Sequence, residues 1–240
     1  MERGGEKRAR AEKILYQIFR LIFMNKKQVI ENTKKFVMKE MKGEGSGHDW
    51  WHVYRVWKNA IHIGRKEKAD MFVVELGALL HDIADFKFHN GDDTVGARVS
   101  REWLKKQKVV EETIKHICDI VSGVSFKGAK VKSKINTKEG MVVQDADRLD
   151  ALGAMGIART FAYGGSKGRE IYNPEIKAVQ HKTFKAYKNA NSTSINHFYE
   201  KLLLLKDLMN TKTGKRMAGE RHQFLKQYLG RFLKEWEGKI

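Results

Sequence analysis

The sequence predicts an all-α protein. It contains one proline in 240 residues, and proline is the residue that most strongly interrupts helices. Long stretches of the chain repeat apolar residues three or four positions apart, the spacing of one helix face. With 41% apolar residues the chain can bury a substantial core. We therefore expect one helical bundle with an extra N-terminal helix over residues 24–240, preceded by an extension over residues 1–23.

The charge balance indicates phosphate-bearing partners without choosing among them. The chain carries 47 Lys and Arg against 29 Asp and Glu, a net charge of +18. Such a field attracts nucleic acid, acidic membranes and small nucleotides alike, and evenly spread lysines are also typical of a solvated surface. The single cysteine, Cys118, excludes a disulfide framework and any zinc site built from cysteine pairs. We expect it to be a small buried residue in a protein of the reducing cytoplasm.

The N-terminal extension combines a basic start with a short apolar run. Residues 14–23 are mostly apolar, but a membrane-spanning helix needs about 20 such residues. No signal-peptide pattern is evident. The extension is expected either to lie on a membrane surface, to pack on the body of the protein, or to precede a true start at Met24.

Two helices are expected before the pair His81-Asp82. An amphipathic helix over residues 29–41 should end in the glycine-rich loop 43–47, which supplies the cap of the next helix. That helix, residues 48–63, carries His48 and His52 four positions apart on one face. Its apolar stripe indicates packing on the core and consists of Val53, Val56, Trp57, Ala60 and Ile61.

A buried helix over residues 69–81 should end in the pair His81-Asp82. Burying an imidazole beside an ionised carboxylate is unfavourable unless a cation holds both. Asp85 follows three residues after Asp82, so one more helical turn would bring the three side chains together. The dipeptide alone identifies nothing, because a second copy occurs at His48-Asp49.

The rest of the chain is expected to be helical, with three aspartates in one segment. The predicted helices cover residues 94–107, 109–122, 141–163, 198–208 and 223–236. Residues 127–138 read as an exposed basic loop. In the helix 141–163, Asp145 is a candidate for the N-terminal cap. Asp147 and Asp150 share a face and require a cation, either Arg148 and Arg159 or a metal. Its glycines, Gly153 and Gly156, should let another helix approach.

Together these segments offer the order His, His-Asp, Asp on three helices, the third of which comes later in the chain. Two imidazoles and two carboxylates suit an octahedral site that keeps positions for water, as Mn²⁺, Mg²⁺, Co²⁺ and Fe²⁺ form. In this order of residues, the chain closely resembles the HD superfamily of metal-dependent phosphohydrolases. The resemblance covers residues 25–240. It is carried by GHDWWHVYRV at 47–56, LLHDIAD at 79–85 and QDADRLDALG at 144–153. More narrowly, the chain resembles a bacterial subgroup that includes nucleotide pyrophosphohydrolases.

The resemblance implies an all-α HD-domain fold and a set of metal ligands. These ligands are His52, His81, Asp82 and Asp147, with Asp145 in reserve and Mn²⁺ as the first choice of ion. The family also has an acid after the His-Asp pair, here Asp85, which would orient water or carry its proton.

Basic side chains are expected to hold the phosphate charge of the substrate. Arg55, one turn after His52, and Lys87, close to Asp85, are best placed for this. Lys127, Arg148 and His48 are further candidates for contacts to the substrate.

The function expected from this resemblance is hydrolysis of nucleotides, in the specific form of nucleoside triphosphates split into monophosphate and pyrophosphate. Nucleoside monophosphates, cyclic nucleotides and alarmones are alternative substrates, since related folds use the same ligands. A different alternative is a basic nucleic-acid-binding or regulatory protein in which the metal site is structural. The sequence does not indicate an oligomeric state.

Overall fold

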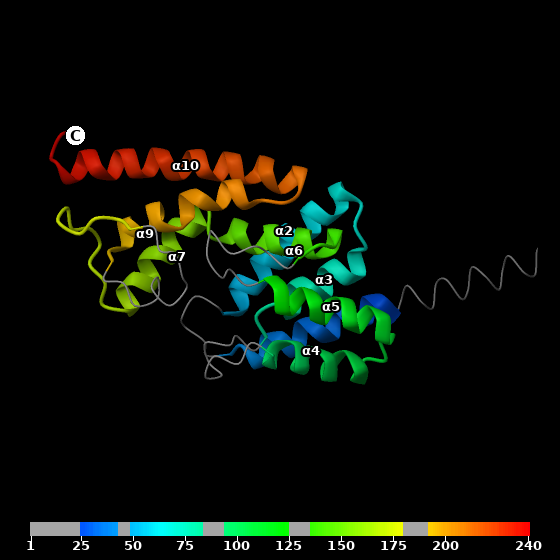
Figure 1. Cartoon of the computed structure of the whole chain (residues 1–240). Helices are drawn as coiled ribbons and strands as arrows, with labels where there is room; N and C mark the ends of the chain where they lie inside the picture. The colour runs from blue at the N-terminus through cyan, green and yellow to red at the C-terminus, as the bar shows by residue number, and fades with distance from the viewer. Residues whose placement is uncertain (1–24, 43–48, 84–93, 125–134, 180–191) are drawn as a thin grey trace, which may run out of the picture.

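The computed structural model describes residues 25–42, 49–83, 94–124, 135–179 and 192–240, and these contain helices and no strand (Figure 1). The all-α prediction is confirmed. The chain is helical over residues 25–40, and the elements that follow are α2 (Trp50–Glu67), α3 (Met71–Leu80), α4 (Val95–Lys106), α5 (Glu111–Val124), α6 (Lys138–Asp150), α7 (Gly153–Ser166), α9 (Ser194–Glu200), the 3₁₀ helix η2 (Leu202–Leu208) and α10 (Lys212–Trp236). Among these, no helix combines the length and the apolar character that crossing a bilayer requires. The extension 1–23 lies outside the described residues.

The centre of the molecule is formed by α2, α3 and α6. Helix α2 packs against α6 and α3, α5 packs on α3, and α4 covers α5, while the long α10 lies over α6 and α7 (Figure 1). The buried faces of the three central helices are mostly aliphatic, and apolar burial holds them together. The buried charged side chains of α6, Asp145 and Asp150, are hydrogen-bonded. Cys118 on α5 is buried, as expected, and donates to the carbonyl of Ala97.

The start of α2 differs from the prediction in its cap. The side chain of Asp49 accepts a hydrogen bond of 2.9 Å from the backbone N–H of His52, so Asp49 and not the loop 43–47 caps this helix. Residues 43–48 lie outside the described part of the chain. The cap fixes the first turn, and His52 therefore sits on the buried face of α2 beside Val53 and Val56.

The predicted helix 141–163 is two helices. Helix α6 begins after its cap Thr137, which excludes Asp145 as the cap, and it ends at Asp150. Leu152 is extended and Gly153 has φ +69°, which turns the chain into α7. A Cβ on Gly156 would lie 2.2 Å from the carbonyl oxygen of Ala151, so this glycine is needed by the turn itself and not, as predicted, by a neighbouring helix.

The C-terminal helices also differ from the predicted ranges. The segment 198–208 is divided between α9 and η2 at Lys201, whose φ of −138° breaks the helix. Helix α10 begins eleven residues before the predicted start of 223, after the cap Thr211. In both places the apolar spacing continues across residues whose backbone changes direction, so spacing alone does not fix the boundaries.

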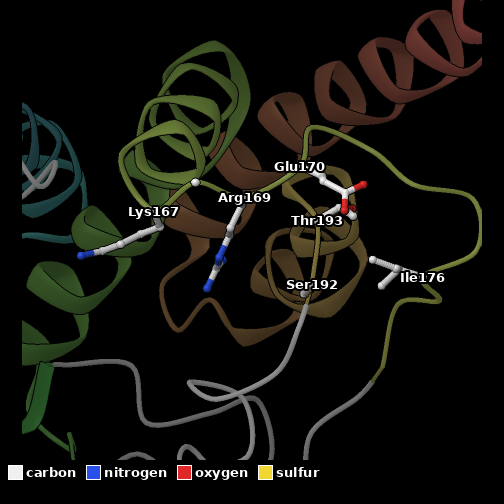
Figure 2. Close-up of a pocket in the computed structure, with 7 residues that line it drawn as sticks. Lys167, Arg169, Glu170, Ile176, Ser192 and Thr193 are labelled. Atoms are coloured by element: carbon white, nitrogen blue, oxygen red, sulfur yellow. The ribbon is translucent and has the colours of Figure 1, made fainter.

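A cavity of about 250 Å³ opens at the C-terminal end of α7 (Figure 2). Its lining residues are Lys167, Gly168, Arg169, Glu170, Ile176, Ser192 and Thr193. None of the predicted metal ligands is among them. The 14 residues of α7 separate this cavity from the end of α6 by roughly 20 Å, since an α-helix rises about 1.5 Å per residue.

Candidate metal centre

Two buried histidines present their Nε2 atoms to one point. His52 lies on α2 and its Nδ1 is 2.7 Å from Oδ2 of Asp150. His81 is the C-cap residue directly after α3, and its Nδ1 is 2.8 Å from the carbonyl oxygen of Ala78. A carbonyl or an ionised carboxylate only accepts, so each Nδ1 carries the hydrogen and each neutral ring keeps a lone pair on Nε2.

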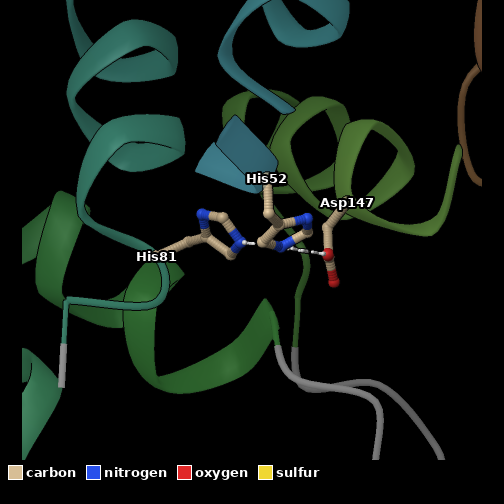
Figure 3. Close-up of side chains that lie close together, drawn as sticks. All are labelled: His52, His81 and Asp147. Carbon is tan, nitrogen blue, oxygen red and sulfur yellow. Dashed lines mark hydrogen bonds and ion pairs between the residues drawn. The ribbon is translucent and has the colours of Figure 1, made fainter. Parts of the chain in front are cut away.

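Four side chains converge around these two nitrogens. The Nε2 atoms are 3.2 Å apart, and Oδ1 of Asp147 lies 3.5 Å from His52 and 3.8 Å from His81 (Figure 3). Oδ2 of Asp82 lies 3.4 Å and 3.6 Å from the same nitrogens. The ligand atoms of His52, His81 and Asp147 all lie within 4.8 Å of one another, close enough to hold one ion.

The chemistry of this donor set fits a divalent cation. Two lone pairs facing each other at 3.2 Å repel unless a proton or a metal lies between them. Burial by itself lowers the pKa of His52, but hydrogen bonds to Asp150 and Asp82 outweigh it and raise the pKa to about 9. The imidazoles are 1% exposed, and the carboxylates of Asp82 and Asp147 are 11% and 23% exposed. The carboxylates therefore form the side of the centre that solvent can reach.

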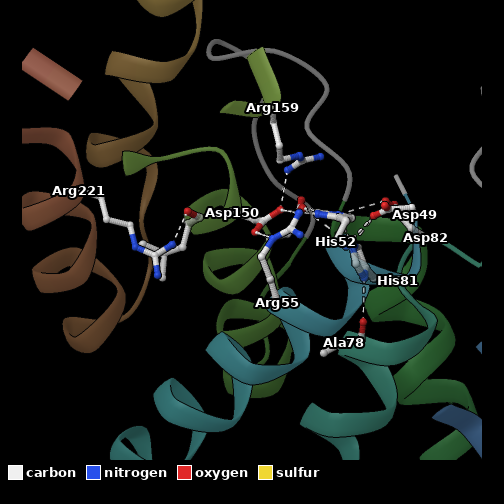
Figure 4. Close-up of polar contacts among 11 residues, drawn as sticks. Asp49, His52, Arg55, Ala78, His81, Asp82, Asp150, Arg159 and Arg221 are labelled. Atoms are coloured by element: carbon white, nitrogen blue, oxygen red, sulfur yellow. Dashed lines mark hydrogen bonds and ion pairs between the residues drawn. The ribbon is translucent and has the colours of Figure 1, made fainter. Parts of the chain in front are cut away.

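Behind His52 lies a carboxylate shared by three partners. Asp150 accepts from Nδ1 of His52, from Nε and Nη2 of Arg55 at 2.7 Å and 3.0 Å, and from Nη1 of Arg159 at 2.8 Å (Figure 4). Burial alone would raise the pKa of Asp150, but His52, Arg55 and Arg159 hold it well below its usual range. The carboxylate is therefore ionised and paired.

Asp145, the reserve ligand, is engaged elsewhere. Its Oδ1 accepts from the backbone N–H and the side-chain amide of Asn210, and its Oδ2 accepts from the N–H and the hydroxyl of Thr211. It thus anchors the segment that starts α10. The geometry favours Asp147 over Asp145 as the fourth donor.

The predicted phosphate-binding arginines have protein partners. Arg55 donates from Nε and Nη2 to Asp150. Its Nη1 has no hydrogen-bond partner among the described residues, and its side chain is 26% exposed. Arg148 donates from Nη1 to the carbonyl of Leu208. Four predicted site residues, His48, Asp85, Lys87 and Lys127, lie outside the described residues, so the structure does not place them.

The role of Asp150 was missed by the sequence analysis. The sequence indicated that Asp150 needs a cation and named Arg159 among the alternatives, which the structure confirms. It gave no sign that the same carboxylate contacts His52, 98 positions earlier in the chain. The available signal was the separation of three residues between Asp147 and Asp150, which places both near one face of α6.

Comparison with known proteins identifies the family of this arrangement. The family model described as HD domain matches residues 50–152, the segment that supplies all four converging side chains. The Bacillus subtilis protein YpgQ is 40% identical over 211 residues, which are 87% of this chain and 94% of YpgQ.

Solved structures agree with this match. An HD-superfamily hydrolase from Bacillus thuringiensis has a TM-score of 0.70 and 44% identity, covering 88% of this chain and 98% of its own. YpgQ in complex with ADP has a TM-score of 0.67 and 36% identity in the structural comparison, covering 86% and 96%. A Lactobacillus plantarum protein has a TM-score of 0.75 and 34% identity, covering 88% and 98%.

Proposed function

Because this chain belongs to the HD superfamily of hydrolases, we propose that it is a divalent-metal-dependent phosphohydrolase of nucleotides. Its specific reaction is the hydrolysis of nucleoside triphosphates to monophosphates and pyrophosphate. The observation that carries the proposal is the convergence of His52, His81, Asp82 and Asp147. The two Nε2 atoms are 3.2 Å apart, and one oxygen of each carboxylate lies 3.4–3.8 Å from both of them.

These four side chains are the ligands of the ion in this proposal. Two neutral nitrogens and two carboxylate oxygens suit Mn²⁺ first, and Mg²⁺, Co²⁺ or Fe²⁺ as alternatives. When bound, the ion supplies Lewis acidity for attack of water on phosphorus. The protein holds the two imidazoles rigidly through Asp150 and Ala78, while the partly exposed carboxylates face the side from which a substrate arrives.

The choice of nucleotides rests on two observations. YpgQ, a relative that covers most of this chain, has been solved with ADP. The net charge of +18 favours approach of a polyanionic substrate. Arg55 is the described residue best suited to meet a phosphate, because its Nη1 has no hydrogen-bond partner among the described residues and its side chain is partly exposed. Asp85 as the residue that orients water stays a prediction, and so do Lys87, Lys127, Arg148 and His48 as substrate contacts.

A panel of nucleotides assayed with Mn²⁺ tests the proposal. The panel holds nucleoside triphosphates, monophosphates, cyclic nucleotides and alarmones, and the assay separates orthophosphate from pyrophosphate. We expect pyrophosphate release from triphosphates, its loss with a chelator and its return with Mn²⁺. Asp82→Ala should lower turnover at least about a thousandfold, because it removes a ligand. Asp207→Ala, at an exposed carboxylate on η2, is the matched control and should leave turnover unchanged.

Each other outcome has a definite meaning. Metal-dependent turnover of monophosphates or cyclic nucleotides in place of triphosphates would overturn the triphosphate assignment. The protein would then be a phosphohydrolase with a different nucleotide substrate. Absence of metal-dependent turnover on every member of the panel would overturn the proposed function as a whole.

A further inference from the structure

We propose that Asp150 is a positioning residue that aims Nε2 of His52 at the metal centre, held in place by Arg55 and Arg159. The inference rests on the proposed metal centre and adds to it a residue that touches neither ion nor substrate. It is drawn from one buried carboxylate on which three structural elements meet (Figure 4).

The contacts of Asp150 leave it no freedom. It is the last residue of α6 and its side chain is 1% exposed. His52 and Arg55 reach it from α2, and Arg159 reaches it from α7, by four hydrogen bonds of 2.7–3.0 Å. Oδ2 alone accepts from all three residues. A rotation of the carboxylate would break several of these bonds at once.

An imidazole needs such a partner to act as a ligand. The ring can carry its hydrogen on either nitrogen and can turn by 180° about its bond to Cβ, and only one combination presents a lone pair on Nε2 at the centre. A carboxylate opposite Nδ1 selects that combination, because it accepts a hydrogen and cannot donate one.

The second histidine shows the same requirement met in a different way. His81 donates from Nδ1 to the carbonyl of Ala78 in its own helix, so the backbone of α3 orients this ring. At Nδ1 of His52, a side chain from another helix, that of Asp150, takes the place of the carbonyl. Local structure thus orients His81, and tertiary structure orients His52. Only the partner of His52 is a side chain, so only that hydrogen bond can be removed by changing the partner residue.

The two arginines explain how a carboxylate can be kept in this place. Removing an ionised carboxylate from water is costly, and it is tolerated where hydrogen-bonded cations compensate the charge. Arg55 contacts both oxygens, and Arg159 contacts the oxygen that His52 uses. Arg159 comes from the helix after the break at residues 151–152, so the turn between α6 and α7 is what brings this cation to the site.

Asp150→Asn tests the inference, because it keeps the size of the side chain and replaces an acceptor by an N–H donor. We expect the affinity for Mn²⁺, measured by titration calorimetry without nucleotide, to fall about 10- to 100-fold, the usual cost of losing such an outer partner. Asp207→Asn, an exposed carboxylate paired with Lys206, is the matched control and should bind Mn²⁺ as the wild type does.

A second readout reports the ring itself. In the Zn²⁺-loaded protein, long-range ¹H–¹⁵N spectra show which nitrogen of His52 carries the hydrogen. We expect Nδ1 in the wild type, and loss of that single form in Asp150→Asn. If Asp150→Asn fails to fold, Arg159→Gln is the milder variant, since it removes one of the four hydrogen bonds, and Arg159→Lys should retain more affinity than Arg159→Gln.

The outcomes separate this inference from the proposed function. A folded Asp150→Asn protein with wild-type Mn²⁺ affinity and an unchanged His52 spectrum would overturn the positioning role, whatever the substrate. A wild type that binds Mn²⁺ but hydrolyses no nucleotide would overturn the proposed function and leave the positioning role standing. A wild type that binds no divalent ion would overturn both.

Discussion

Nε2 of His52 and Nε2 of His81 lie 3.2 Å apart although the residues are separated by 29 positions, and each ring gives its Nδ1 hydrogen to a different acceptor. Two basic nitrogens at this distance must share a proton or a metal ion. The competition between these two occupants has consequences for affinity, stability and pH.

Metal affinity should increase with pH up to about 9. In the metal-free protein burial lowers the pKa of His52, but Asp150 and Asp82 more than compensate and raise it to about 9. A metal ion must displace this proton at lower pH, so the apparent Kd for Mn²⁺ should fall about tenfold per pH unit between pH 6.5 and pH 9 and then level off. Calorimetric titrations at several pH values measure this. If the affinity for Mn²⁺ did not change between pH 6.5 and pH 9, the shared-proton description would be wrong.

The metal-free protein should lose stability over the same range. The pKa of His52 is about 9 when folded against 6.5 when unfolded, so its stabilising effect is full below pH 6.5 and is lost as pH rises through 9. The loss is roughly 3 kcal/mol at about 1.4 kcal/mol per pH unit. Thermal unfolding in chelator should show Tm decreasing with pH, and His52→Gln should flatten that slope. His62→Gln, on the exposed face of α2, is the control that keeps it.

Asp145 and Asp147 should give opposite phenotypes. Asp145→Asn places a donor against the N–H groups of Asn210 and Thr211 and should cost about 2–4 kcal/mol of stability, with metal affinity retained. Asp147→Asn should lower Mn²⁺ affinity about 100-fold or more and leave Tm in chelator close to that of the wild type. Urea unfolding and calorimetry on the two variants decide the matter. The reverse pattern would make Asp145 the ligand.

Two glycines of α10 should respond in opposite directions to alanine. At Gly214 a Cβ would lie 2.3 Å from Oδ2 of Asp145, so Gly214→Ala should destabilise by about 1–3 kcal/mol. Gly219 has nothing within 4 Å of that position, and Gly219→Ala should stabilise by about 0.5–1 kcal/mol because alanine favours a helix. Urea unfolding of both variants measures the difference. Equal effects would show that Asp145 does not approach α10 as described.

The predictions from sequence succeeded where the pattern is local. Helical periodicity identified α2, α3, α4 and α5 to within a few residues. It failed at Leu152 and Lys201, where apolar spacing continues through residues whose backbone is not helical. Asp145 shows a second limit, because a buried aspartate that follows an apolar run, here residues 141–143, looks the same in the sequence whether it binds an ion or the start of a distant helix.

The sequence by itself determined the fold class, because helical spacing is a local pattern. Its three short motifs carried the resemblance to the HD superfamily, which implied His52, His81 and Asp82 as ligands and placed Asp147 ahead of Asp145 as the last one. Only the tertiary structure decided that Asp150 serves His52, that Asp145 serves α10, and that Arg55 and Arg159 compensate one buried charge. The physical reason is that a hydrogen bond depends on positions in space to within a few tenths of an ångström. Residues 98 positions apart acquire such positions only when α2, α6 and α7 have packed.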